Sequence, residues 1–297
     1  MTNKITLKRN VKIINDEYVI KKKKHSLKST YNYLLSRSFD YFPEIVKEDD
    51  NYLYFKYIRD VSEPAEQKMI DLLILLSILH SKTTFYKEVD LDYYKSIYEG
   101  INKKIDDVYN YYNNLMDTID NEIFMSPANY LIARNITLVY NSLNYAKENI
   151  ELWYEMIENK HQVRLVTIHN NLSLDHYLKS DKPYLISWDN AKTDMPIYDL
   201  VTLYQNHALD FEFIDILKIY LNKFPLSDEE MLLFFILISI PDKIKAMPTE
   251  YETTISISSH LDYLTKTKIL REEYRIKQKT NKSSELQKQD QNIDKTR

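Results

Sequence analysis

Residues 165–200 read LVTIHNNLSLDHYLKSDKPYLISWDNAKTDMPIYDL, and this stretch decides the fold of the chain. Two short runs, residues 163–168 and 183–188, are apolar and β-branched, which is typical of buried strands. A polar loop lies between them, and residues 196–204 return to a helical pattern. The sequence therefore predicts two strands that frame a polar loop within a mostly helical region.

The chain before this stretch changes character at residue 58. Strand-like runs flank an Asn15-Asp16 turn, residues 25–36 resemble a short helix, and residues 52–58 form an aromatic, β-prone run. The helical pattern then predominates, with a long, mostly buried helix predicted over residues 62–80 and two further long helices over 91–117 and 127–158. Beyond the segment 165–200, helices are predicted over residues 212–221 and 227–239. Ser126 and Pro127 are typical of the start of the helix over 127–158.

The last part of the sequence, residues 276–297, is polar and charged and has almost no apolar side chain, which predicts a disordered tail. We therefore predict an α+β chain in three parts. Residues 1–58 form a small β-rich N-terminal lobe. Residues 59–275 form a large helical lobe that contains the segment 165–200, and residues 276–297 are the tail.

The composition excludes several classes of site. The sequence has no cysteine and a single glycine, Gly100, which rules out disulfides, thiolate metal centres and the glycine-rich phosphate loops of the Walker and Rossmann types. The 40 basic and 44 acidic residues give a formal net charge of −4, so nothing in the overall charge attracts nucleic acid or an anionic membrane. We expect neither among the partners.

The sequence also lacks the hydrophobic segments that direct a protein to or through a membrane. No apolar core follows the first ten residues, as a secretory signal would require. The most apolar stretch, residues 231–240, is much shorter than the roughly 20 residues needed to cross a bilayer. We expect a cytoplasmic protein.

The polar loop and its flanks follow a known pattern. His169 ends the first strand, Ile186 and Trp188 surround Ser187 at the end of the second, and Asp199 opens the next helix. This arrangement resembles the catalytic core of the aminoglycoside phosphotransferase and choline kinase superfamily, and within it the bacterial spore-coat kinase-like proteins. In that superfamily the first strand leads to His-x-Asp and then Asn, and the second ends in Ile-Asp-Trp or Ile-Asp-Phe.

The resemblance covers about residues 10–240 and implies a two-lobed protein kinase-like fold with a small β-rich N-lobe and a large helical C-lobe. It also implies ATP with Mg²⁺ or Mn²⁺ as cofactors of an active member. Phosphoryl transfer depends on positioning and on neutralising charge, so a lysine must reach the phosphates and oxygen ligands must hold the metal. Lys21 stands where the family has its strand lysine. His169 stands where the family has its loop scaffold.

Several positions depart from the family pattern. Asn171 occupies the position of the catalytic aspartate, and an amide can orient a hydroxyl but cannot take its proton. His176 replaces the metal-binding asparagine, and Ser187 replaces the metal-binding aspartate; imidazole and a neutral hydroxyl are poor ligands for Mg²⁺. Asp175 and Asp189 are the nearby carboxylates that could hold the metal instead, and Asp189, two residues beyond Ser187, could share its strand face and form a displaced metal site.

Three hypotheses follow. The first is a degenerate phosphotransferase, or pseudokinase, that acts by binding a nucleotide, another small molecule or a protein partner, and has no cofactor. The second is an active ATP-dependent small-molecule phosphotransferase with a metal site rearranged around Lys21, Asn171, His176 and Asp189. The third is a structural protein of the spore-coat assembly type. The substitutions at Asn171 and Ser187 favour the first.

Overall fold

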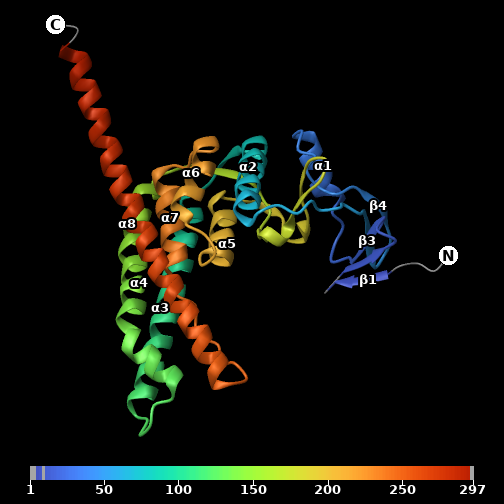
Figure 1. The fold of residues 1–297 in the computed structure, drawn as a ribbon. Helices are drawn as coiled ribbons and strands as arrows, with labels where there is room; N and C mark the ends of the chain where they lie inside the picture. The colour runs from blue at the N-terminus through green and yellow to red at the C-terminus, as the bar shows by residue number, and fades with distance from the viewer. Residues whose placement is uncertain (1–4, 9–10, 295–297) are drawn as a thin grey trace. The chain divides into compact units, whose positions relative to one another are not determined.

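The computed structural model describes residues 5–8 and 11–294, and the side chains of residues 11–277. Contacts between Cα atoms divide the chain into two compact units (Figure 1). Unit 1 comprises Met1–Glu88, Gln162–Asn206 and Ile216–Leu226, and unit 2 comprises Val89–His161, His207–Asp215 and Ser227–Arg297. Unit 1 carries the strands, and the long helices lie in unit 2, so the chain has the α+β fold that the sequence predicts.

A five-stranded antiparallel sheet opens unit 1. Its order is β1-β2-β3-β5-β4, with β1 (Ile5–Lys8), β2 (Val11–Ile14), β3 (Tyr18–Lys22), β4 (Ile45–Glu48) and β5 (Tyr52–Lys56). Asn15 and Asp16 connect β2 to β3 with φ of 52° and 55°. Two successive positive φ values suit a tight hairpin turn, and Asn and Asp tolerate them better than most residues. The predicted turn is therefore confirmed.

The segment 165–200 belongs to two smaller sheets of unit 1. One has the order β10-β7-β6 and the other is a β8-β9 hairpin, with β6 (Phe85–Glu88), β7 (Gln162–Ile168), β8 (Tyr177–Lys179), β9 (Pro183–Leu185) and β10 (Lys192–Asp194). The second predicted strand, over residues 183–188, ends early at Leu185. Ser187 has a left-handed backbone with φ of 68°, which cannot continue a strand.

The remaining elements of unit 1 are helices. They are α1 (Lys28–Ser36), α2 (Ala65–Thr83) and α5 (Ile197–His207), the last reaching one residue beyond the unit, while α6 (Phe213–Lys223) has residues in both units. The apolar side of α2 is almost completely buried, with Leu72, Leu76 and Leu79 inaccessible to solvent. The buried helix that the sequence predicts over residues 62–80 is therefore confirmed.

Unit 2 is built from long helices, namely α3 (Leu91–Asp120), α4 (Pro127–Ile157), α7 (Asp228–Ser239) and α8 (Glu250–Asp294). The side chain of Ser126 accepts a hydrogen bond from the Asn129 N–H at 3.2 Å, and Pro127 follows as the first helical residue. This is the helix start that the sequence predicts. Among the helices that the structure describes, none combines the length and the apolar character needed to span a bilayer.

The end of the chain differs from its prediction. Residues 276–294 continue α8 as helix, where the sequence led us to expect a disordered tail from residue 276. The segment has no Pro or Gly and contains four Lys and four Gln residues, which have high helix propensity, but it has no apolar face. Residues 295–297 of the predicted tail lie outside the described part of the chain. The division into lobes at residue 58 stays a prediction.

Two neighbouring residues of α4 test the core of unit 2. Trp153 is almost fully buried and lies edge-on to Tyr94, with ring centroids 6.3 Å apart, whereas Leu152 is half exposed. We predict that Trp153→Ala lowers the free energy of unfolding by about 3–5 kcal/mol, because it leaves a large cavity. Leu152→Ala, the control, should change it by less than about 0.5 kcal/mol. Similar losses in the two variants, measured by urea denaturation, would contradict this packing.

Candidate functional site

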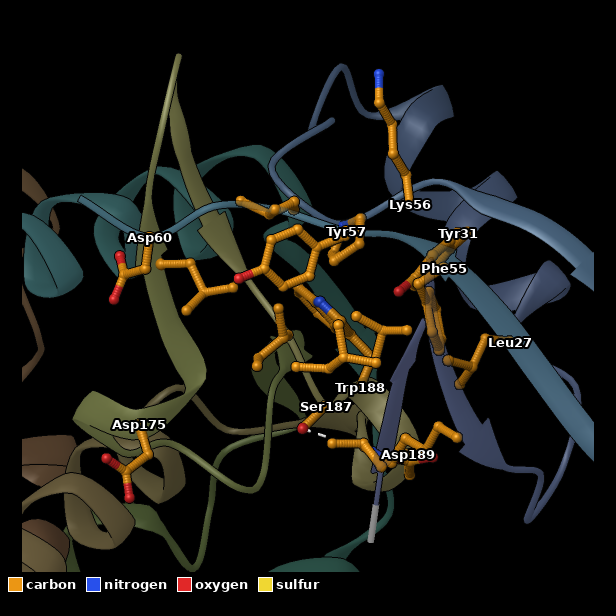
Figure 2. A pocket seen from close by; sticks show the side chains of 18 residues that line it. Leu27, Tyr31, Phe55, Lys56, Tyr57, Asp60, Asp175, Ser187, Trp188 and Asp189 are labelled. Atoms are coloured by element: carbon orange, nitrogen blue, oxygen red, sulfur yellow. Dashed lines mark hydrogen bonds and ion pairs between the residues drawn. The ribbon is translucent and has the colours of Figure 1, made fainter. Parts of the chain in front are cut away.

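Lys21 is the fourth of the five residues of β3 and lies opposite Val11 of β2 and Leu53 of β5. Its ammonium group forms an ion pair with the Asp189 carboxylate and lies 3.5 Å from the Ser187 hydroxyl (Figure 2). The Asp189 side chain is only 8% exposed and the Lys21 side chain 20%. The structure thus brings together three of the six residues that the sequence singled out.

Ser187 is held in a left-handed conformation by its neighbours. For a residue other than glycine this backbone costs roughly 1–2 kcal/mol, and it persists only where surrounding contacts enforce it. The Ile186 N–H donates to the His176 carbonyl at 2.9 Å, and the buried Trp188 indole donates to the Leu185 carbonyl at 2.8 Å. These bonds fix both sides of Ser187, whose hydroxyl lies beside Lys21.

Asp199, at the start of α5, fixes the beginning of the polar loop. Its carboxylate accepts hydrogen bonds from the backbone N–H groups of His169, at 2.8 Å, and Asn170, at 2.7 Å. The ring of His80 lies on the other side, with Nε2 3.2 Å from the carboxylate and Nδ1 2.7 Å from the Tyr220 hydroxyl. His80, His169 and Asp199 are completely buried, so this network anchors the loop from inside unit 1.

His169 links the loop to the end of β9. Its Nε2 donates a hydrogen bond to the Ile186 carbonyl at 2.7 Å, and its Nδ1 is buried without a partner. Burial lowers the pKa of the His169 ring, and the nearby Asp199 charge opposes only part of that effect. The ring is therefore neutral at pH 7 and acts through its hydrogen bond, which is the geometry of a scaffold.

Asn171 and His176 are joined by a hydrogen bond within the loop. The His176 Nδ1 donates to the Asn171 backbone carbonyl at 2.6 Å. Because a carbonyl can only accept, Nδ1 carries a proton. Neither residue is among the described residues that line the adjacent cavity, whereas Lys21, Ser187 and Asp189 are.

The cavity beside Lys21 has a volume of about 310 Å³. Figure 2 shows it enclosed by side chains from the sheet, from α1 and from the segment around Ser187. Its walls are largely apolar and include Val11, Ile13, Val19, Leu27, Phe55 and Ile186. An apolar cavity with a few polar groups at one end is the usual form of a small-molecule site.

Some residues of this site have no distinctive signal in the sequence. Tyr31 of α1 lines the cavity, and its pKa is raised mainly by burial and further by the Asp189 charge. Asp175 and the linker residues Tyr57 and Ile58 line it as well. The spacing of Tyr31 and Leu34 marks one face of the predicted short helix, but no local pattern shows that this face borders a cavity.

The oxygen and nitrogen donors near Lys21 do not fit Mg²⁺. Nowhere in residues 11–277 do three His, Asp or Glu side chains come together as metal ligands. The Asp189 carboxylate is already paired with Lys21, and the Ser187 hydroxyl is neutral. Mg²⁺ is usually held by one or two carboxylates together with phosphate oxygens and water, and here the best placed carboxylate is engaged by a cation.

Solved structures with a similar arrangement of elements include phosphotransferases. An aminoglycoside phosphotransferase from Alicyclobacillus acidocaldarius superimposes with a TM-score of 0.68 at 10% identity, over 91% of this chain and 92% of that one. The chain has a kinase-like fold. A spectinomycin phosphotransferase in complex with ADP and spectinomycin gives a TM-score of 0.55 at 11% identity, over 90% of this chain and 93% of that one.

The kinase-like fold confirms the predicted two-lobed architecture and the resemblance to aminoglycoside phosphotransferases at the level of structure. No protein-family model matches the sequence, and no curated protein matches it. At these identities the likeness concerns the fold alone. The closer relation to spore-coat kinase-like proteins stays a prediction, as do the roles of the six site residues.

Removing the Asp199 carboxylate tests the loop anchor. We predict that Asp199→Ala lowers the free energy of unfolding by about 3–5 kcal/mol, because it leaves the buried N–H groups of His169 and Asn170 without an acceptor. Asp181→Ala is the control, since Asp181 is an exposed acid in the β8–β9 turn, bonded only to Tyr184; its effect should stay within about 0.5 kcal/mol. Equal effects in chemical denaturation would show that Asp199 is no anchor.

The pH dependence of stability tests the buried His169. Its pKa in the folded chain is lowered from 6.5, so the unfolded chain binds a proton more readily. The associated stability is complete above pH 6.5 and is lost as the pH falls below that value. We predict that the unfolding free energy of the wild type declines between pH 7 and pH 5 more steeply than that of His169→Gln. Parallel curves would contradict a neutral, buried ring.

Proposed function

We propose that this chain is a kinase-like protein that binds a small molecule of the nucleotide class in the cavity beside Lys21 and does not carry out ordinary metal-dependent phosphoryl transfer. The observation that carries the proposal is the ion pair between Lys21 and Asp189. The positive charge expected to hold phosphates is neutralised by a carboxylate of the same site. The protein would therefore act through binding.

The chemistry of the loop supports the same conclusion. The Asn171 amide cannot accept the proton of an attacking hydroxyl, and loss of a general base lowers a rate by roughly 10² to 10⁴. Phosphoryl transfer needs a free cation at the phosphates and carboxylates that hold the metal ion. In this chain the Lys21 cation is neutralised by Asp189, and Ser187 offers only a neutral hydroxyl. The lack of a general base, of a free cation or of a metal-binding carboxylate would each slow the reaction. Together these changes remove the groups that stabilise the charge of the transferred phosphoryl group.

Binding of a nucleotide-type ligand has separate support. The two spectinomycin phosphotransferase structures of this fold contain ADP in one case and AMP in the other. In this chain the cavity lies against β2, β3 and β5 and is apolar enough to take a flat base. A cytoplasmic location, a protein partner and a spore-coat-type assembly role stay predictions of the sequence.

The competing candidate is an active phosphotransferase in which Asp189 holds a metal ion. It is favoured by one observation, the buried carboxylate next to Ser187. In that enzyme Asp189 would have to leave Lys21 for the metal, and both side chains would then be free for ATP. The two candidates therefore differ in whether ATP is turned over.

A turnover assay separates these candidates. We predict that the wild-type chain, incubated with radiolabelled ATP and Mg²⁺ or Mn²⁺, releases or transfers phosphate no faster than buffer alone, with water, choline and an aminoglycoside as acceptors. Metal-dependent turnover that disappears in Asp189→Ala and persists in the control Asp181→Ala would overturn the proposal and establish the rearranged active site.

A further inference from the structure

The charges around the cavity bear on what it can bind. Its lining contains the cations Lys21 and Lys56 and the carboxylates Asp60, Asp175 and Asp189. Lys21 is paired with Asp189, and Asp60 is paired with Lys68 at 3.4 Å. Figure 2 shows Lys56 extending away from the other labelled side chains. No cation is therefore both unpaired and directed into the cavity among the described lining residues.

One carboxylate remains without compensation. Asp175, next to the polar loop, is exposed and forms neither an ion pair nor a side-chain hydrogen bond with any described residue. The tyrosine hydroxyl of Tyr31 has its pKa raised by burial and by the Asp189 charge, so it stays protonated and neutral. Asp175 thus leaves an uncompensated negative charge at the polar end of the cavity, remote from the outward-directed Lys56, and this charge repels a polyanion.

The rest of the cavity suits a flat, uncharged molecule with a polar edge. The side chains of Val19, Phe55 and Ile186 provide apolar walls. Beyond β5, Ile58 and Arg59 take part in no backbone hydrogen bond of the described chain, and Ile58 lines the cavity. The backbone N–H and C=O groups of Ile58, at the cavity wall, are available to a ligand with donors and acceptors on one edge, as a nucleobase has.

From these observations we infer that the ligand of this cavity is an uncharged purine nucleoside or base, bound in preference to a nucleoside triphosphate. The inference rests on the proposed binding function and specifies the ligand class. The cavity volume of about 310 Å³ agrees with it, since this lies at the lower end of the range for small-molecule pockets. Lys21 then serves to neutralise the buried Asp189 and contacts no phosphate.

The test is a calorimetric titration of the full chain with adenosine, guanosine, ATP alone and ATP with Mg²⁺, at one pH and ionic strength. We expect at least one nucleoside to bind about tenfold more tightly than either form of ATP, a difference of about 1.4 kcal/mol. Tighter binding of ATP than of both nucleosides would overturn the inference and leave the proposed binding function intact. Absence of binding by all four would overturn both.

Two variants test the electrostatic cause. Asp189→Asn frees Lys21, and Asp175→Asn removes the uncompensated charge at an exposed position where folding is not at risk. Each should increase the affinity for ATP by about tenfold or more while changing the affinity for the nucleoside less than about threefold. Asp181→Asn, an exposed acid outside the cavity, is the control and should change neither. An unchanged ratio of the two affinities in both variants would refute the inference.

Discussion

The ion pair between Lys21 and Asp189 determines what this site can do. Lys21, near the end of β3, pairs with the largely buried carboxylate of Asp189 in the 3-10 turn that follows Ser187. Each charge compensates the other in a setting with little water, where either one alone would be costly. A phosphotransferase needs this cation and carboxylate unpaired, which is why we propose a ligand without phosphate.

The pair depends in turn on a rigid loop. Asp199 holds the backbone at His169 and Asn170, and the His169 ring holds the Ile186 carbonyl, one residue before Ser187. Ser187, whose backbone is left-handed, thus follows a residue that is held by hydrogen bonds and leads into the 3-10 turn that contains Asp189. In the function that we propose, this loop is retained as a scaffold for binding, while Asn171 and the paired Lys21 and Asp189 do not support phosphoryl transfer.

The sequence predicts those features of the fold that depend on local chemistry. The Asn15-Asp16 turn and the Ser126 helix cap each follow from side chains within a few residues. Lys21 and Asp189 are 168 positions apart, so no local pattern predicts that they pair. Only the resemblance to a family indicated that both belong to one site. His80 and Asp199, which are buried against each other, are 119 positions apart and equally without a local signal. The left-handed backbone of Ser187 is enforced by tertiary contacts and leaves no pattern in the local sequence. At the end of the chain, the composition indicated disorder, whereas the helix propensity of the same residues agrees with the observed extension of α8.

The strength of the ion pair is the quantity on which this account depends most directly. A double-mutant cycle with Lys21→Met, Asp189→Asn and the combined variant, followed by urea unfolding, isolates the coupling between the two side chains. We expect a favourable coupling of about 1 kcal/mol or more, as is typical of a largely buried pair. Additive effects, with a coupling near zero, would mean that the Lys21 ammonium is not held by Asp189 and is available to phosphates, which would contradict the pairing and the function proposed from it.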